Sequence, residues 1–379
     1  MTALPRPDVD PDGLLEFSVV FTDRSLNHMS AAFQGVMREL HAILCEVYGA
    51  ERAVIVPGGG TYAMEAVARQ FATGKKVLVI RNGFFSYRWT QIFEAGQIPS
   101  EEIVLKARRT GNEPTSPFAP VPIDEATQRI RDERPAVVFA PHVETASGMI
   151  LPDDYIAALA AATHEVGGLF VLDCVASGTI WVDMKATGVD VLISAPQKGW
   201  SAPPSAGLVM MNEAALEACR AAKSTSFAAD LGKWTTIMEA YLNGGHAYHA
   251  TMPTDALRVL RDAMVETKAD GFERLKDAQW EQGRAVRKLL AERGVKSVAA
   301  EGFAAPGVVV SYTDDPEIQN GKKFLAQGLQ IAAGVPLMVD EGPDYKSFRL
   351  GLFGLDKLDD VDASLGRLEA VFDKVFPKG

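Results

Sequence analysis

Residues 169–177 read Leu-Phe-Val-Leu-Asp173-Cys-Val-Ala-Ser, and residues 190–198 read Asp-Val-Leu-Ile-Ser-Ala-Pro-Gln-Lys198. Each stretch contains a short apolar run and ends near one ionisable residue. Runs of this length bounded by turn-forming residues are typical of strands that are covered on both faces in a parallel sheet. Open α/β sheets bind ligands at the carboxyl ends of such strands. We therefore expect two neighbouring strands to bring Asp173 and Lys198 to one site.

An aspartate and a lysine at adjoining strand ends suit pyridoxal phosphate chemistry. There the lysine amine forms a Schiff base with the cofactor aldehyde, and a carboxylate keeps the pyridine nitrogen protonated so that the ring accepts electrons. The alternative is a plain buried ion pair between Asp173 and Lys198, because ion pairs also occur for structural reasons. The two residues alone do not separate these interpretations.

Length and charge limit the classes of protein to consider. The chain has 379 residues, 47% of them hydrophobic, which allows a large core and exceeds the size at which single cores usually stop growing. Two subdomains are therefore expected. The formal charge of −11, without long basic runs, argues against a nucleic-acid surface. An anionic cofactor then needs a local site made of backbone amides and a few side chains.

Cysteines and apolar segments bear on location. Cys45, Cys174 and Cys219 are few, odd in number and widely spaced, which suits a reducing compartment and not a disulfide framework. The first residues lack the apolar core of a signal peptide, and no run of about 18 apolar residues is available to span a membrane. We expect a cytoplasmic protein without a membrane partner.

A glycine loop between an apparent strand and a helix is a candidate anion site. Ala53-Val-Ile-Val56 is followed by Pro57-Gly-Gly-Gly60-Thr61 and then by a helical pattern. Glycines let backbone amides approach an anion at a helix N-terminus. The loop fits neither the dinucleotide fingerprint nor the phosphate loop of nucleotide-binding proteins. A tight turn without a ligand is the alternative.

Several motifs together resemble the class V aminotransferases of fold type I, nearest the alanine-glyoxylate and serine-pyruvate or serine-glyoxylate group. They are Asp173-Cys-Val-Ala-Ser177, Ser194-Ala-Pro-Gln-Lys198 and Ala202-Pro-Pro204, with further matches from about Asn27 to Gly354. The resemblance implies an α/β fold: a large domain with a mostly parallel sheet covered by helices, and a smaller C-terminal α/β domain. We predict an N-terminal arm at 1–25, a large cofactor-binding domain at 26–253, and a linking helix with the small domain at 254–379.

The resemblance also implies which residues contact pyridoxal phosphate. Lys198 holds the cofactor as an aldimine, and Asp173 binds its ring nitrogen. The phosphate loop corresponds to Gly59, Gly60, Thr61 and Tyr62. Phe85 stacks on the ring and Val175 packs on its other face. Thr145 bonds the cofactor at its phenolic oxygen or at the neighbouring ring edge, and Gln197 contacts the cofactor beside the lysine.

Some of these positions depart from the family pattern or have simpler interpretations. Relatives often carry Ser, Gly and His in the phosphate loop, and a Gly-Pro-rich turn where this chain has Phe21-Thr-Asp-Arg-Ser25. The second departure leaves the substrate open. Without the resemblance, Phe85 is a core residue and Thr145 a capping hydroxyl in a polar loop. Glu144 and His142 are expected to be structural.

The resemblance also assigns roles to three residues of the C-terminal half, which would contact the substrate and the partner subunit's cofactor. Tyr248 and Thr251, in Tyr248-His-Ala-Thr-Met-Pro253, reach the partner's cofactor phosphate in a homodimer. Arg349, in Arg-Leu-Gly-Leu-Phe-Gly354, grips the substrate α-carboxylate. The alternative for Arg349 is a salt bridge between domains.

The sequence also predicts local elements that flank these motifs. Apolar spacing from Phe33 onward predicts a helix with Ser30 as its N-cap. In the C-terminal part we predict strands near 307–313 and 347–354, a helix from about Glu317 to Ala333, and a last helix from Leu358.

We therefore predict a homodimeric, pyridoxal phosphate-dependent aminotransferase. It would move an amino group from a small amino acid, such as alanine or serine, to a 2-oxo acid such as glyoxylate or pyruvate, with Lys198 shuttling the proton. One alternative is a class V lyase or cysteine desulfurase, which needs a nucleophilic cysteine. Another is a non-catalytic binding protein on the same scaffold.

Overall fold

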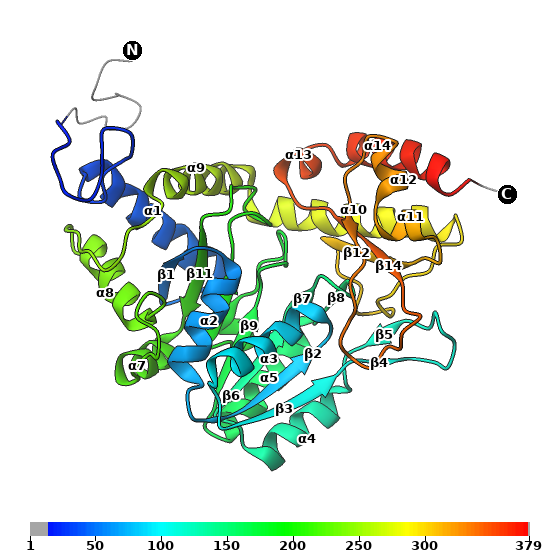
Figure 1. The fold of residues 1–379 in the computed structure, drawn as a ribbon, viewed down its shortest axis with the longest axis horizontal. Helices are drawn as coiled ribbons and strands as arrows, with labels where there is room; N and C mark the ends of the chain where they lie inside the picture. The colour runs from blue at the N-terminus through cyan, green and yellow to red at the C-terminus, as the bar shows by residue number, and fades with distance from the viewer. Residues whose placement is uncertain (1–13, 378–379) are drawn as a thin grey trace.

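The computed structural model describes residues 14–377, so residues 1–13 of the predicted arm and residues 378–379 lie outside the described part. A seven-stranded sheet forms the larger part of the molecule (Figure 1). In spatial order its strands are β1 (Arg52–Pro57), β11 (Ala206–Met211), β10 (Val191–Ser194), β9 (Leu169–Asp173), β6 (Val137–Pro141), β2 (Lys76–Arg81) and β3 (Glu101–Lys106).

Only β11 runs against its neighbours in this sheet, where it pairs antiparallel with β1 and β10. The pairs β10–β9, β9–β6, β6–β2 and β2–β3 are parallel. The predicted mostly parallel sheet is therefore confirmed. All residues of β6, β10 and β11 are buried, as expected for apolar strands covered on both faces.

Helices pack on this sheet and on one another. α2 (Gly60–Phe71) contacts β11, α5 (Asp153–Glu165) contacts β9, and α8 (Leu231–Leu242) contacts β1. The other elements of this part include α3 (Phe84–Gly96), α4 (Ile123–Glu133), α6 (Met184–Thr187) and α7 (Glu213–Ala221), and the short strands β4 (Arg108–Arg109), β5 (Phe118–Ala119), β7 (Val143–Glu144) and β8 (Met149–Ile150).

The first helix illustrates how local sequence sets an element. α1 spans Ala31–Tyr48, and the Ser30 side chain accepts a hydrogen bond of 3.1 Å from the Phe33 amide, so the predicted N-cap is confirmed. Gly49 ends the helix with a φ of 65°, a left-handed conformation that glycine adopts without strain. The buried face of α1 contains Phe33 and Leu40, as the apolar spacing predicted.

The C-terminal part is a second, smaller α/β unit (Figure 1). It follows the long helices α9 (Thr254–Asp270) and α10 (Phe272–Ala291), and its sheet has the order β12 (Val308–Tyr312), β14 (Ser347–Gly351) and β13 (Ala332–Ala333), all antiparallel. The helix α14 (Val361–Val375) packs on α10. The domain boundary predicted after residue 253 falls immediately before α9 and stays a prediction.

One predicted helix is wrong. Instead of a helix from Glu317 to Ala333, the chain forms the short helices α11 (Pro316–Gln319) and α12 (Lys322–Leu325) and then the strand β13. Gly321 and Gly328 adopt φ values of 80° and 79°, which interrupt a right-handed helix. The last helix is also displaced, because Leu358 closes the short helix α13 (Leu355–Leu358) and Asp360 caps α14.

Within residues 14–377, none of the helices is both long and apolar enough to cross a membrane.

Candidate active site

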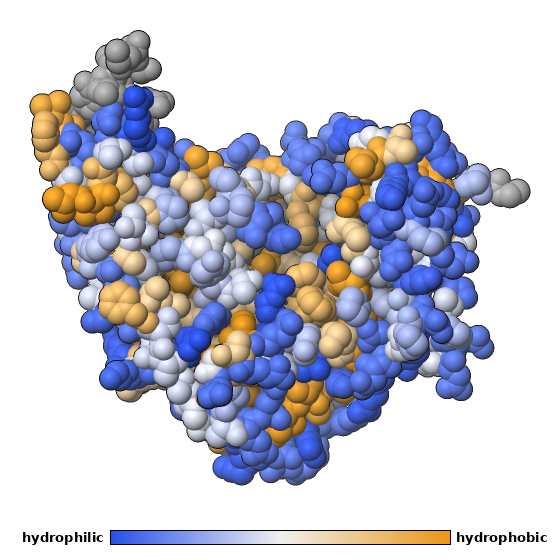
Figure 2. All heavy atoms as spheres, in the orientation of Figure 1, coloured by the Kyte–Doolittle hydropathy of each residue, from blue (hydrophilic) through white to orange (hydrophobic). Residues whose placement is uncertain are grey.

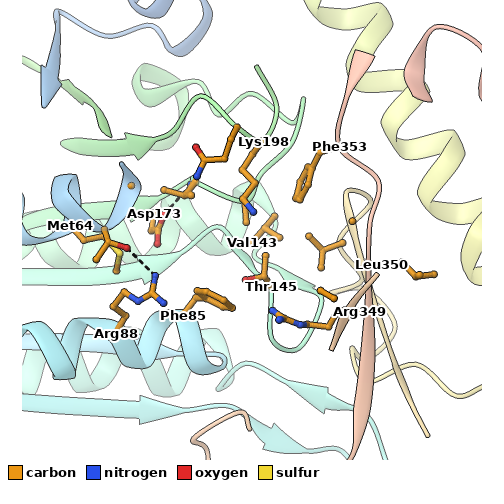
Figure 3. A pocket seen from close by; sticks show the side chains of 18 residues that line it. Met64, Phe85, Arg88, Val143, Thr145, Asp173, Lys198, Arg349, Leu350 and Phe353 are labelled. Carbon is orange, nitrogen blue, oxygen red and sulfur yellow. Dashed lines mark hydrogen bonds between the residues drawn. The ribbon is translucent and has the colours of Figure 1, made fainter. Parts of the chain in front are cut away.

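A cavity of about 410 Å³ lies between the carboxyl edge of the main sheet and the strand β14 (Figure 3). It brings together residues that are far apart in sequence and that the sequence had marked as site residues. Those that line it are Gly60, Thr61, Phe85, Thr145, Asp173, Val175, Gln197, Lys198 and Arg349. Gly59, Tyr62, Tyr248 and Thr251 do not line it.

Asp173 is the last residue of β9 and is paired in register with Ile193 of β10 and Pro141 of β6. The side chain is 8% exposed, and its Oδ1 accepts a hydrogen bond of 2.9 Å from the Val175 amide. The pKa of Asp173 is raised to about 6, mainly by burial and to a smaller extent by the Glu144 carboxylate, while the Val175 amide and the Arg88 charge oppose the shift. A buried carboxylate with so little compensation is suited to receive a cationic N–H group.

Lys198 follows β10 and points into the same cavity (Figure 3). Burial lowers the pKa of Lys198, and the charge of Arg349 lowers it further. A lowered pKa increases the neutral amine fraction that a nucleophile needs. No ion pair joins Lys198 to Asp173, although both are among the described residues, so the simple ion-pair interpretation is wrong.

The glycine loop sits at the start of α2, beside the Asp173 strand. Gly59 precedes the helix without a side-chain cap, which leaves the first helical amides open to an anion. A β-carbon at Gly60 would lie 2.8 Å from Cγ2 of Val175, so only glycine allows this close approach. The ring of Tyr62 packs over Gly58 and is 61% exposed, outside the cavity.

Glu144 ties together two segments that line the cavity. Its fully buried carboxylate accepts hydrogen bonds from the amides of Phe85 (3.1 Å), Ser86 (2.8 Å) and Ala146 (2.9 Å). A carboxylate at the N-terminus of α3 is favoured by the helix dipole. Glu144 therefore fixes the backbone that carries Phe85 and the loop that carries Thr145.

His142 supports the turn after Asp173 from the opposite side. Its Nδ1 is 2.7 Å from the Ser177 hydroxyl, and its amide donates to the carbonyl of Asp173 at 2.8 Å. Complete burial lowers the pKa of His142 to about 3, so the ring is neutral. His142 holds the turn and does not line the cavity.

Arg349 lies in the middle of β14 and enters the cavity from the small unit (Figure 3). Its Nε donates to the Ala333 carbonyl at 2.8 Å, and its guanidinium carbon is 5.6 Å from the Phe85 ring centroid. It forms no ion pair with a carboxylate of the described chain, so the interdomain salt bridge is not formed. The guanidinium is therefore available to a ligand anion.

The sequence reasoning missed Arg88 and Phe353. Arg88 is one turn after Phe85 on α3 and lines the cavity, and Phe353 follows β14 with its ring centroid 5.4 Å from Lys198 Nζ. The i, i+3 spacing from Phe85 is a signal that could have placed Arg88 on the same side of the helix. Phe353 lies inside the quoted Arg-Leu-Gly-Leu-Phe-Gly motif but has no polar group to draw attention.

Tyr248 and Thr251 lie on the surface, away from the cavity of their own chain. Tyr248 is 55% exposed, and its hydroxyl is 3.0 Å from that of Thr251. Their predicted contact with a partner's cofactor therefore stays a prediction.

None of the three cysteines lines the cavity. Cys45 is half-buried, and Cys174 and Cys219 are buried. Burial raises the pKa of Cys45 and of Cys219 to about 11 and that of Cys174 well above its ordinary value. The cysteine desulfurase alternative thus lacks the thiolate that it needs.

Comparison with known proteins gives a consistent result. The family model described as "Aminotransferase class-V" matches residues 18–334. A 2-aminoethylphosphonate--pyruvate transaminase of Paraburkholderia phymatum is 28% identical over 91% of this chain and 90% of its own. The soluble hydrogenase 42 kDa subunit of Anabaena cylindrica is 26% identical over 98% and 92%. The solved structure of an alanine--glyoxylate aminotransferase from Nostoc sp. has a TM-score of 0.75 at 22% identity, covering 91% and 88%, and shows the shared fold.

Proposed function

The chain belongs to the class V aminotransferase family, whose members depend on pyridoxal phosphate, and we propose that it moves an amino group from a small anionic amine to a 2-oxo acid. The observation that carries the proposal is the arrangement of Lys198, Asp173 and Arg349 in one cavity. None of the three is ion-paired to another described residue. Each is therefore free for the ligand atom that its chemistry suits.

The cavity fits pyridoxal phosphate on observations of the chain itself. A buried carboxylate suits a protonated ring nitrogen, an uncapped helix start suits a phosphate, and a lysine of lowered pKa suits an aldehyde. Gly60, Thr61 and Gln197 would hold the phosphate side, next to the backbone of Gly59. The Tyr62 amide already donates to the Gly59 carbonyl at 3.0 Å, so the part proposed for Tyr62 is limited to its side chain. Phe85, Val175 and Thr145 would hold the ring.

When bound, pyridoxal phosphate supplies an electron-withdrawing ring that accepts the electrons of a bond broken at the substrate carbon. Asp173 then holds the proton on the ring nitrogen. As a free amine, Lys198 Nζ would take the proton from the substrate carbon that carries the amino group, and the resulting ammonium would return that proton within the same cavity. Arg349 orients the substrate through its acid group, so that this carbon faces Lys198.

Two donor classes fit an arginine anchor. The first is a small α-amino acid such as alanine or serine, with glyoxylate or pyruvate as acceptor. The second is 2-aminoethylphosphonate, with pyruvate as acceptor, because relatives carrying that name match about nine-tenths of this chain. Both donors present an anion to Arg349 at a short distance from a primary amine.

We also propose a homodimer, in which Tyr248 and Thr251 contact the partner's cofactor phosphate. Large apolar side chains are exposed at Leu14, Leu15, Phe17 and Val19, and also at Phe227 and Tyr248. Figure 2 shows apolar side chains gathered on the N-terminal segment at the upper left. Exposed apolar clusters of this kind mark protein contacts. A cytoplasmic location, consistent with three unpaired cysteines, belongs to the same proposal.

The test is a matrix of donors and acceptors. Alanine, serine and 2-aminoethylphosphonate would each be incubated with glyoxylate or pyruvate, the purified protein and pyridoxal phosphate, and the new amino acid would be quantified by mass spectrometry. Because pyruvate transamination yields alanine, alanine as donor is paired only with glyoxylate. We expect one donor to support sustained formation of glycine or alanine. Absence of product with every donor would contradict the proposed function.

A second measurement locates the cofactor. Reduction of the loaded protein with borohydride, followed by peptide mapping, should place the label on Lys198. A label on another lysine would show that the cofactor is held elsewhere. Colourless protein that takes up no pyridoxal phosphate would favour the non-catalytic alternative.

A further inference from the structure

Arg88 makes two contacts within the cavity, and its charge acts on a third group there (Figure 3). Its Nη1 donates a hydrogen bond of 3.0 Å to the Thr61 hydroxyl, and its guanidinium carbon lies 4.9 Å from the Phe85 ring centroid. Its charge also opposes the rise in the pKa of Asp173. Among the described residues, no carboxylate forms an ion pair with Arg88. One side chain thus joins the anion loop to the stacking ring, and it lines the same cavity as the buried carboxylate of Asp173.

The hydrogen bond from Arg88 occupies an acceptor position of the Thr61 hydroxyl, so the hydroxyl proton of Thr61 points away from Arg88. A hydroxyl has one donor and two acceptor positions, whereas a guanidinium only donates. Because Arg88 donates to Thr61 Oγ1, the Thr61 proton is left for another acceptor. Thr61 stands in the first turn of α2, where uncapped amides and the helix dipole already favour an anion.

The charges around Asp173 show why the guanidinium matters there. The segment after β6 contributes the carboxylate of Glu144 and the neutral ring of His142, and Cys174 follows Asp173 in the chain. Glu144 disfavours ionisation of Asp173, and Lys198 lines the same cavity from beyond β10. The second guanidinium, that of Arg349, lies 5.6 Å from the Phe85 ring centroid, and burial lowers its pKa while Glu144 opposes that shift. Arg88 is therefore the cation that offsets Glu144 at Asp173.

We propose that Arg88 is a positioning residue for the cofactor, which turns the Thr61 hydroxyl toward the phosphate, packs on the Phe85 ring and places a positive charge in the cavity that Asp173 lines. The inference rests on the proposed function, because it requires pyridoxal phosphate in this cavity. It divides the two arginines between two ligands. Arg349 serves the substrate anion, and Arg88 serves the cofactor through Thr61 and Asp173.

The test measures cofactor affinity against pH, by equilibrium dialysis of pyridoxal phosphate between pH 5 and 8.5. Three variants are compared with the wild type: Arg88→Met removes both the charge and the donors, Arg88→Lys keeps the charge without the planar fork, and Arg129→Met is a surface control. Arg129 pairs with Glu133 on α4, remote from the cavity. Comparing proteins at each pH cancels the titration of the cofactor itself.

We expect the wild-type affinity to increase as Asp173 ionises near pH 6. Arg88→Met should raise the Kd at neutral pH by about tenfold or more, since a charge-assisted hydrogen bond is lost. Its pH midpoint should also move upward, because the cation opposite Asp173 is gone. Arg88→Lys should keep the wild-type midpoint while its Kd increases, and Arg129→Met should match the wild type.

Two results would overturn the role of Arg88 alone. One is an Arg88→Met variant that keeps the wild-type Kd at every pH. The other is a higher Kd with an unchanged midpoint, which would indicate packing and not charge. Thermal unfolding of each variant identifies any protein that fails to fold. If Arg88→Met does not fold, the pH midpoint of cofactor affinity in Arg88→Lys tests the effect of the charge, because this variant keeps the charge. If the wild type itself binds no pyridoxal phosphate, the proposed function fails together with this inference.

Discussion

The side of the cavity formed by the main sheet rests on strands inside a seven-stranded sheet, whereas the opposite side rests on the three-stranded sheet of the small unit. Asp173 ends one buried strand and Lys198 follows another, and both strands are paired on both sides. Arg349 lies on β14, whose neighbour β13 has only two residues, both exposed. The difference suggests that the sheet side fixes the cofactor and the chemistry, while the small unit selects the substrate.

The largest expected effect is on the sheet side. Lys198→Ala removes the amine that moves the proton, and general acid–base groups contribute about 10²–10⁴-fold to rates. Because the same amine also carries the cofactor, we expect product formation to fall by at least about 10³-fold. Quantifying the amino acid product over several hours checks this, with the exposed Lys233→Ala as a control. Near-normal turnover would remove the lysine from the mechanism.

Asp173→Asn should lower kcat by about 10²-fold or more, because asparagine does not stabilise the charged ring nitrogen. The same change should stabilise the protein without cofactor. The pKa of Asp173 in the folded chain, about 6, is above its ordinary value of about 3.9. Folding therefore favours the protonated form, and ionisation destabilises the folded state increasingly from about pH 4 to pH 6.

The stability gain from Asp173→Asn is thus fully present above pH 6 and disappears near pH 4. At about 1.36 kcal/mol per pKa unit, the gain is on the order of 3 kcal/mol at pH 7.5. Thermal unfolding of the two apoproteins at pH 4 and pH 7.5 measures it as a higher Tm only at the higher pH. Equal Tm values at pH 7.5 would show that the carboxylate is not strained by burial.

Arg349→Gln tests the other side of the cavity. The loss of a charged hydrogen-bond donor to the substrate anion should raise KM by about 10–100-fold, while the Kd of pyridoxal phosphate changes little. Arg349→Lys retains the charge without the planar fork, so its KM should lie between that of the wild type and that of Arg349→Gln. A parallel loss of cofactor affinity in Arg349→Gln would remove the proposed division between the two sides.

The sequence predicted the sheet side of the cavity better than the side formed by the small unit. Asp173 and Lys198 could be found because buried strands leave a local apolar pattern that ends at the site. The small unit was harder, since glycines at 321 and 328 with positive φ break a segment whose apolar spacing resembles a helix. Arg88 was missed because a cation on a helix usually faces solvent, whereas here α3 packs beside α2 and Arg88 reaches Thr61 in the cavity.

Phe353 belongs to the small unit but lies close to Lys198, so it tests whether the two sides of the cavity have separate roles. Its ring packs against glycines of three different segments, because a β-carbon at any of them would lie 3.2–3.5 Å from the ring; these are Gly178, Gly307 and Gly351. The ring centroid is 5.4 Å from Lys198 Nζ. Since non-bonded carbons need about 3.5–4.0 Å, no substrate atom fits between them, and the ring forms a wall beside the reacting amine.

Phe353→Ala should therefore change the choice of donor and leave the cofactor in place. Opening the wall should raise kcat/KM for bulkier amines relative to alanine by roughly tenfold, the scale of one or two methylene groups. The Kd of pyridoxal phosphate should stay at the wild-type value, and the exposed Leu325→Ala serves as a control. An unchanged donor ratio together with weaker cofactor binding would place Phe353 with the sheet side, because the ring would then be supporting Lys198 and not limiting the substrate.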